Sequence, residues 1–251
     1  MIIQSLSSVT GSQWMLIFLS AALIGMAKGG VKGAGMLAVP LMAGIYGGKA
    51  STGIVLPMLV MADVMAVKFY NRDANWRFIW RLIPAAAAGI LLAMVVGIYI
   101  NDELFKRMMG MVIIASLALM IIQERRPLSA ALTGGWVFGS VFGLLGGFST
   151  MIGNAAGPVM TVYLLAIALP KNQFLGTGAW FFLLINLFKV PLHIFVWKTI
   201  TWSSLPIDLV TFPAILIGAW AGMRIVRLLP EREFRYFMIG MTFIVALRLF
   251  F

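Results

Sequence analysis

The sequence predicts an all-α polytopic integral membrane protein, built from two homologous halves of about five membrane segments each. Three observations indicate this class. The chain is 62% hydrophobic with a mean hydropathy of +1.01, whereas soluble domains are about 45–50% apolar. Its apolar residues form continuous runs rather than the alternating pattern of a transmembrane β-barrel. Finally, the runs recur in a similar order in the two halves.

Ten apolar segments can be recognised, five in the N-terminal repeat (1–126) and five in the C-terminal repeat (127–251). In order they are 6–27, 34–47, 53–70, 78–100, 107–122, 134–152, 156–169, 174–193, 205–226 and 236–251. We expect the first to be a retained span rather than a signal peptide, since residues 1–13 carry no positive charge.

The second segment of each half is unusually short. Segments 34–47 and 156–169 have 14 residues each, about 21 Å at helical rise, whereas a full span needs roughly 20 residues. A pair of short hydrophobic segments in corresponding positions indicates the binding site of a repeat-built transporter. We therefore expect broken or re-entrant segments that form a site near the membrane midplane.

An internal duplication is indicated by residues that recur at a constant spacing. Asp63 matches Asn186 and Pro40 matches Pro158 at somewhat smaller offsets, as insertions would cause. Four further pairs share one offset: Pro84 with Pro213, Gly89 with Gly218, Phe105 with Phe234, and Met109 with Met238.

The distribution of basic residues bears on topology. The chain has 19 Lys and Arg against 8 Asp and Glu, and basic loop residues remain in the cytoplasm. Ten crossings with the N-terminus outside place 13 of the 19 basic residues on the cytoplasmic side, whereas eight crossings divide them 10 to 9. The charge count therefore favours ten crossings and an inverted repeat. It does not indicate nucleic-acid binding, because no basic patch with an aromatic platform is present.

A glycine-rich basic stretch follows the first segment. Lys28 and Lys32 are four residues apart and share a face if the stretch is helical. One interpretation is that they bind an oxyanion together with backbone N–H groups and the positive end of a helix that begins near Gly33. The alternative is that both lysines snorkel to the interface. The glycines concerned are Gly29, Gly30, Gly33 and Gly35.

The equivalent stretch of the second half is uncharged. It offers hydroxyl and amide donors ahead of Pro158, a residue well tolerated in the first turn of a helix. The alternative reading is close helix packing through small residues. The candidate anion-binding residues here are Ser149, Thr150, Gly153, Asn154 and Gly157.

Asp63 is the only acidic residue deep inside a segment. A carboxylate at the bilayer centre costs about 2.5–3.5 kcal/mol on insertion scales, so it must be paired, protonated or hydrated. It could couple transport to protons or pair with a lysine of the site. The alternative is a structural ion pair with Lys68 or Lys28.

Segment 174–193 carries three further polar residues. Lys189 and His193 are four apart, and Asn186 corresponds to Asp63 but cannot titrate. His193 is the only histidine of the chain and could titrate near neutral pH, which makes it a second candidate for coupling. The alternative is a packed or interfacial histidine.

The order of these motifs resembles the sulfite exporter TauE/SafE family of membrane permeases, from about residue 14 to the end. The resemblance implies transport of sulfur-containing anions, such as sulfite and organosulfonates, across the bacterial cytoplasmic membrane, with coupling to protons. It also implies about eight spans, fewer than the charge count favours. The residues that carry it are Lys28-Gly-Gly-Val-Lys-Gly-Ala-Gly35, Pro40, Gly53-Ile-Val-Leu-Pro57, Asp63, Tyr70 and Trp76, then Gly153-Asn-Ala-Ala-Gly-Pro158, Gly176-Thr-Gly178, Asn186 and Trp202.

We therefore expect a secondary transporter with a small anion and protons as partners, surrounded by membrane lipid, with no cofactor, metal or nucleic acid. A passive anion channel or uniporter is the alternative, and its flux would ignore a proton gradient. A further alternative, an intramembrane enzyme, would need a nucleophile with a base or a metal cluster. The chain has no cysteine and one histidine.

Overall fold

The computed structural model describes residues 9–31, 34–70, 73–125, 135–167 and 169–228. These residues form helices and connecting turns, so the all-α prediction is confirmed. The expected segment 236–251, with Phe234 and Met238, lies outside the described residues. The elements are α2 (Gly11–Lys28), α3 (Ala34–Tyr46), α4 (Gly48–Tyr70), α5 (Trp76–Tyr99), α6 (Asp102–Arg125), α8 (Trp136–Gly153), α9 (Ala156–Ala166), α10 (Lys171–Pro191), the π-helical turn η2 (Leu192–Val196) and α11 (Leu205–Leu228).

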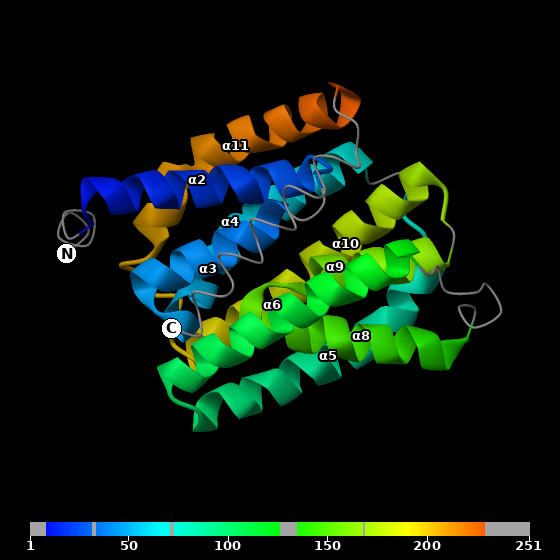
Figure 1. Cartoon of the computed structure of the whole chain (residues 1–251), viewed down its shortest axis with the longest axis horizontal. Helices are drawn as coiled ribbons and strands as arrows, with labels where there is room; N and C mark the ends of the chain where they lie inside the picture. Colours follow the sequence, from blue (N-terminus) through cyan, green and yellow to red (C-terminus); the bar gives the residue numbers. More distant parts are fainter. Residues whose placement is uncertain (1–8, 32–33, 71–72, 126–134, 168, 229–251) are drawn as a thin grey trace.

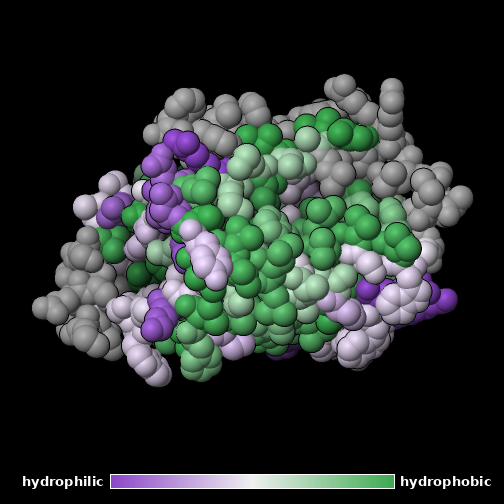
Figure 2. Space-filling view, turned by 90° about the horizontal axis from the view of Figure 1, so that it is seen from below, coloured by the Kyte–Doolittle hydropathy of each residue, from purple (hydrophilic) through white to green (hydrophobic). Residues whose placement is uncertain are grey.

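Six helices of the described part are long and apolar enough to cross a membrane: α2, α4, α5, α8, α10 with η2, and α11. The 24 residues of α5 extend about 36 Å, more than the roughly 30 Å of hydrocarbon in a bilayer. By contrast, α3 and α9 have 13 and 11 residues. Figure 2 shows hydrophobic side chains over the middle of one face and hydrophilic side chains toward its two ends, as expected for a membrane protein.

Two helix pairs lie on opposite sides of the molecule, α2 with α11 and α5 with α8, and the short helices α3 and α9 lie between them with α4 and α10 (Figure 1). The apolar core follows this division. One cluster joins α2, α3, α4 and α11, and a larger one joins α3, α5, α6, α8, α9 and α10. Each pair joins a helix from the first half of the sequence to one from the second, and the helices between the pairs also come from both halves.

Glycines bring the paired helices into close backbone contact. A Cβ atom at Gly147 of α8 would collide with the carbonyl oxygen of Ala86 on α5, and one at Gly89 of α5 would collide with that of Leu144 on α8. The α2–α11 pair has the same reciprocal arrangement, with Gly25 against Ile215 and Gly218 against Ala22. Small residues at helix interfaces permit this approach in membranes, where association depends on packing rather than on exclusion of water.

The start of α2 shows how the local sequence sets a helix end. Thr10 and Gln13 form a capping box, in which the Gln13 backbone N–H donates to Thr10 Oγ1 at 3.4 Å and the Thr10 N–H donates to Gln13 Oε1 at 2.9 Å. These bonds satisfy two backbone donors that would otherwise lack partners in the first turn.

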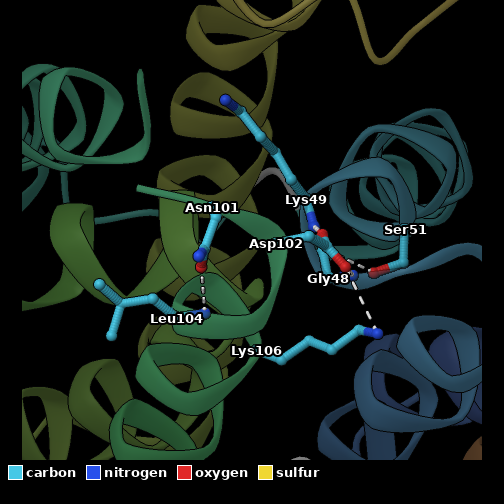
Figure 3. A network of polar contacts seen from close by, with 7 residues as sticks. All are labelled: Gly48, Lys49, Ser51, Asn101, Asp102, Leu104 and Lys106. Carbon is cyan, nitrogen blue, oxygen red and sulfur yellow. Dashed lines mark hydrogen bonds and ion pairs between the residues drawn. The ribbon is translucent and has the colours of Figure 1, made fainter. Parts of the chain in front are cut away.

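The start of α4 is capped from a different helix. Asp102, the first residue of α6, accepts hydrogen bonds from the backbone N–H groups of Gly48 at 3.1 Å and Lys49 at 3.0 Å, and pairs with Lys106 at 3.4 Å (Figure 3). Burial alone would raise the pKa of Asp102, but the donors from Lys49, Gly48 and Lys106 hold this pKa below its ordinary value. The carboxylate thereby ties the start of α4 to the start of α6.

Replacing Asp102 with Ala is expected to reduce stability by about 0.5–2 kcal/mol, as for loss of a helix cap. Because the pKa of Asp102 is lowered in the folded protein, the carboxylate contributes fully above the ordinary pKa range of aspartate. Its contribution is lost as pH falls through the folded pKa. Thermal unfolding in detergent at several pH values measures both effects. Glu103→Ala is the matched control, since Glu103 pairs only with Arg107 on the surface, and equal losses in the two variants would contradict the capping role.

Gly147→Ala is expected to force α8 away from α5, because the added methyl meets the backbone of Ala86. Overpacking of this kind typically costs about 1–3 kcal/mol. The control is Gly146→Ala, one residue earlier, where the nearest atom to the added Cβ is Val159 Cγ1 at 3.9 Å. The two thermal unfolding midpoints in detergent are compared, and a midpoint for Gly147→Ala equal to that of the control would show that the helices can separate at no cost.

Candidate functional site

A cavity of about 150 Å³ is enclosed by residues of α2, α3, α4, α8, α9 and α10, large enough for a molecule of the size of benzene. Both short helices contribute to its wall from their first turns, through Gly35 of α3 and Gly157 of α9. Most of the wall is apolar. Its polar side chains are Lys28, Tyr70, Thr150, Asn154, Thr161 and Asn186.

Lys28 supplies the positive charge of the cavity wall. It is the last residue of α2, and its Nζ lies 2.6 Å from Asp63 Oδ1 on α4. The Lys28 side chain retains 14% of its surface, whereas Asp63 retains none and is not part of the wall. The ring of Phe182 lies 4.0 Å from the same Nζ. The cation therefore has access to the cavity while its carboxylate partner lies behind it.

The pairing of Asp63 decides between the two lysines considered from the sequence. Lys68 is exposed at the end of α4, and the observed partner is Lys28. The other oxygen of the carboxylate accepts a hydrogen bond from Asn186 Nδ2 of α10 at 2.6 Å. Asp63 and Asn186, which correspond in the two halves of the sequence, are thus in direct contact.

Lys189 lies one turn after Asn186 and is fully buried. Its Nζ donates to Asn154 Oδ1 at 2.6 Å, to the carbonyl oxygen of Thr150 at 2.9 Å, to Thr150 Oγ1 at 3.1 Å and to Asn186 Oδ1 at 3.2 Å. A protonated lysine has three N–H donors, which these four oxygen atoms share. Lys189 therefore joins the end of α8 to the middle of α10.

Asn154 adopts a left-handed conformation (φ 49°) directly after α8, which asparagine tolerates better than most residues. Its backbone N–H bonds back to the carbonyl oxygen of Thr150 at 3.0 Å. The chain reverses here and α9 begins at Ala156. The turn brings the Asn154 side chain to the cavity wall, with Nδ2 3.4 Å from the carbonyl oxygen of Thr52.

The glycines after α2 lie in different surroundings, some at the cavity wall and one against α11. Gly30 and Gly35 line the cavity, but Gly29 packs against the Ala219 carbonyl of α11. The N–H groups of Gly29 and Gly30 donate to the carbonyl oxygens of Gly25 and Ala27, so their expected contribution to anion binding has no support in this geometry. Lys32 and Gly33 lie outside the described residues.

Three other residues predicted for the site do not reach the cavity wall. Ser149 is buried within α8, and a Cβ at Gly153 would lie 3.2 Å from Met109 Cγ on α6. His193 is buried in η2, with Nδ1 2.8 Å from Thr199 Oγ1. It lies one turn beyond Lys189, and its ring is perpendicular to that of Trp197.

Sequence reasoning missed Phe182 and Thr161 as parts of the wall. Phe182 precedes Asn186 by four residues on α10, and Thr161 follows Gly157 by four on α9. Helical spacing therefore places each on the same face as a residue that was singled out. This four-residue spacing is the sequence signal that could have identified Phe182 and Thr161.

The helices and the buried charges define a polytopic membrane protein with a small, mostly apolar cavity whose described wall carries the cation Lys28. Residues 17–249 match the protein family described as sulfite exporter TauE/SafE, and the chain belongs to this family. It is a family of membrane transporters, not of enzymes. Comparison with curated proteins and with solved structures found no match.

Because the chain has no cysteine, the cavity can be mapped with single cysteines in an unaltered background. Gly157→Cys is expected to react with a water-soluble thiol reagent, since Gly157 lines the cavity and its Cβ position is free of neighbours within 4 Å. Gly146→Cys, equally tolerant of a Cβ but outside the wall, should react much more slowly. Equal labelling rates in the two variants, measured by mass spectrometry, would contradict a water-accessible cavity at Gly157.

Proposed function

We propose that this protein is a secondary transporter for a small sulfur-containing anion, such as sulfite or an organosulfonate, and that it is coupled to protons. The observation that carries the proposal is the position of Lys28, at the cavity wall, with the buried carboxylate of Asp63 directly behind it. An ion pair that only stabilised the fold would not require its lysine to line a cavity.

The anion would bind to Lys28 and to neutral polar groups of the same cavity wall. Thr150, Asn154 and Asn186 provide hydroxyl and amide groups there. The first turns of α3 and α9 also reach the wall, at Gly35 and Gly157, and the N-terminal end of a helix favours negative charge. Broken helices of this kind hold anionic substrate groups in other transporters, so we place the site near the membrane midplane.

Coupling to protons follows from competition for Lys28. An anion that engages the ammonium withdraws the partner of Asp63, and an unpaired carboxylate within the membrane is costly. The charged groups that face Asp63 are then Lys28 of α2 and, farther away, Lys189 of α10, with Asn186 as a neutral donor. Protonation of Asp63 relieves this cost, so the anion and a proton bind together. By linkage, anion affinity rises as pH falls.

Alternating access would come from an inverted repeat formed by residues 1–126 and 127–251. In support, the first long helix of each half packs on a late helix of the other half through reciprocal glycines, α2 on α11 and α8 on α5. Movement of one half against the other would open the cavity to either side in turn. We further propose ten crossings in the bacterial cytoplasmic membrane, with the loops richest in Lys and Arg inside.

The proposal is tested by sulfite flux, and by flux of a short sulfonate, in proteoliposomes with and without an imposed pH gradient. We expect wild-type flux to follow the gradient and Asp63→Asn to lose this dependence, because asparagine mimics the protonated acid. Lys28→Ala should raise the KM for the anion about tenfold or more, the effect of losing a charge-assisted hydrogen bond.

Lys68→Ala is the control, since Lys68 is an exposed lysine of the same helix as Asp63 and its loss should leave the KM unchanged. Flux that ignores the gradient in wild-type protein and in every variant would indicate a passive channel or uniporter. Absence of flux for every sulfur anion would show that the proposed cargo is wrong.

A further inference from the structure

Lys189 is a second buried cation of the site, and its partners are uncharged. Among the described residues its Nζ forms no ion pair, and its acceptors belong to Thr150, Asn154 and Asn186. All three of these residues line the cavity, whereas Lys189 itself does not. The Lys189 amine therefore lies behind the cavity wall, separated from the cavity by the side chains to which it donates, and it is linked to Lys28 through Asn186 and Asp63.

The ammonium determines how both amides are oriented. A protonated lysine Nζ can only donate, and Asn154 and Asn186 turn their oxygens toward it, at 2.6 Å and 3.2 Å. Their Nδ2 groups consequently point away from Lys189. That of Asn186 donates to Asp63 at 2.6 Å, but within the described part of the chain that of Asn154 has only a long 3.4 Å contact with the carbonyl oxygen of Thr52. The Thr150 hydroxyl accepts from Lys189 as well, which leaves its proton free to donate elsewhere.

We propose that Lys189 is a positioning residue for the anion, which acts through Asn154 and Thr150 by holding their donor groups toward the cavity. This inference rests on the proposed function and deepens it. The ligand chemistry is that of an oxyanion, whose several oxygen atoms accept from the amide, the hydroxyl and Lys28 together. Hydrogen bonds polarise one another in series, so the wall gains positive character without a second ammonium in the cavity.

The formal charges of the site agree with this role. With Lys189 protonated, Lys28 and Lys189 carry two positive charges against the one negative charge of Asp63, so these three groups together hold one uncompensated positive charge. Burial of an uncompensated charge is unfavourable. An anion in the cavity supplies the missing negative charge, and it reaches Lys189 through the amide and hydroxyl groups that the lysine orients.

The test compares sulfite transport in proteoliposomes for wild-type protein, Lys189→Met, Asn154→Ala and the double variant. Lys189→Met should raise the KM for sulfite about tenfold to a hundredfold, with a smaller change in maximal rate. If Lys189 acts through Asn154, the double variant should raise the KM no more than the larger single effect. Fold-changes that multiply would show that Lys189 contacts the anion directly or acts elsewhere, and would overturn the proposal, as would an unchanged KM.

Lys68→Met serves as the matched control, an exposed lysine replaced in the same way, and should leave the KM unaltered. Should Lys189→Met fail to insert, the same cycle is measured with Lys189→Gln, which keeps a polar side chain at this buried position. Wild-type protein that carries no sulfur anion would refute the proposed function itself. Wild-type protein that carries sulfite in a pH-dependent manner, with Lys189 variants of normal KM, would refute only the role of Lys189.

Discussion

The ion pair between Lys28 and Asp63 is the interaction on which the rest of the site depends. A fully buried carboxylate needs a partner or a proton, and the pair with Lys28 engages only one of its oxygens. The second oxygen is satisfied by Asn186, from the other half of the chain. The requirement to pair one buried charge thus fixes α2, α4 and α10 relative to one another, and it places the boundary of the cavity at Lys28.

From Asp63 the polar contacts continue without interruption to the end of α8. Asn186 donates to Asp63 and accepts from Lys189, which in turn donates to Asn154 and Thr150. On either side of this chain, Gly25 and Gly147 bring the flanking pairs α2–α11 and α5–α8 into close backbone contact. The first half of the chain contributes Lys28 to the cavity wall, and the second half contributes the neutral hydrogen-bonding side chains of Thr150, Asn154 and Asn186. This combination agrees with the proposed binding of an anion.

Much of this arrangement could be predicted from residue type and position. Continuous apolar runs predicted an all-helical fold, and two of those runs were too short to span a bilayer. The glycine-rich stretch identified Lys28, and its uncharged counterpart identified Thr150 and Asn154. The glycine N–H groups were expected to bind an anion as well, but those of Gly29 and Gly30 bond within the last turn of α2. Backbone N–H groups at the end of a helix form hydrogen bonds with carbonyl oxygens of that helix, and the sequence motif does not show this.

The sequence by itself determined the environment of the chain and the chemical types available to the site, because hydropathy, charge and glycine content are properties of single residues and short segments. Only the tertiary structure decided which groups meet. A spacing of four residues predicts that Lys189 of α10 and His193 of η2 lie on one helical face, but not that Lys189 contacts Asn154 across the interface while His193 contacts Thr199. Likewise, Lys28 and Lys68 were equal candidates for Asp63 until the packing of α2 against α4 brought one of them within reach. Contacts between distant helices depend on interhelical packing, and that packing is set by the whole fold rather than by local pattern.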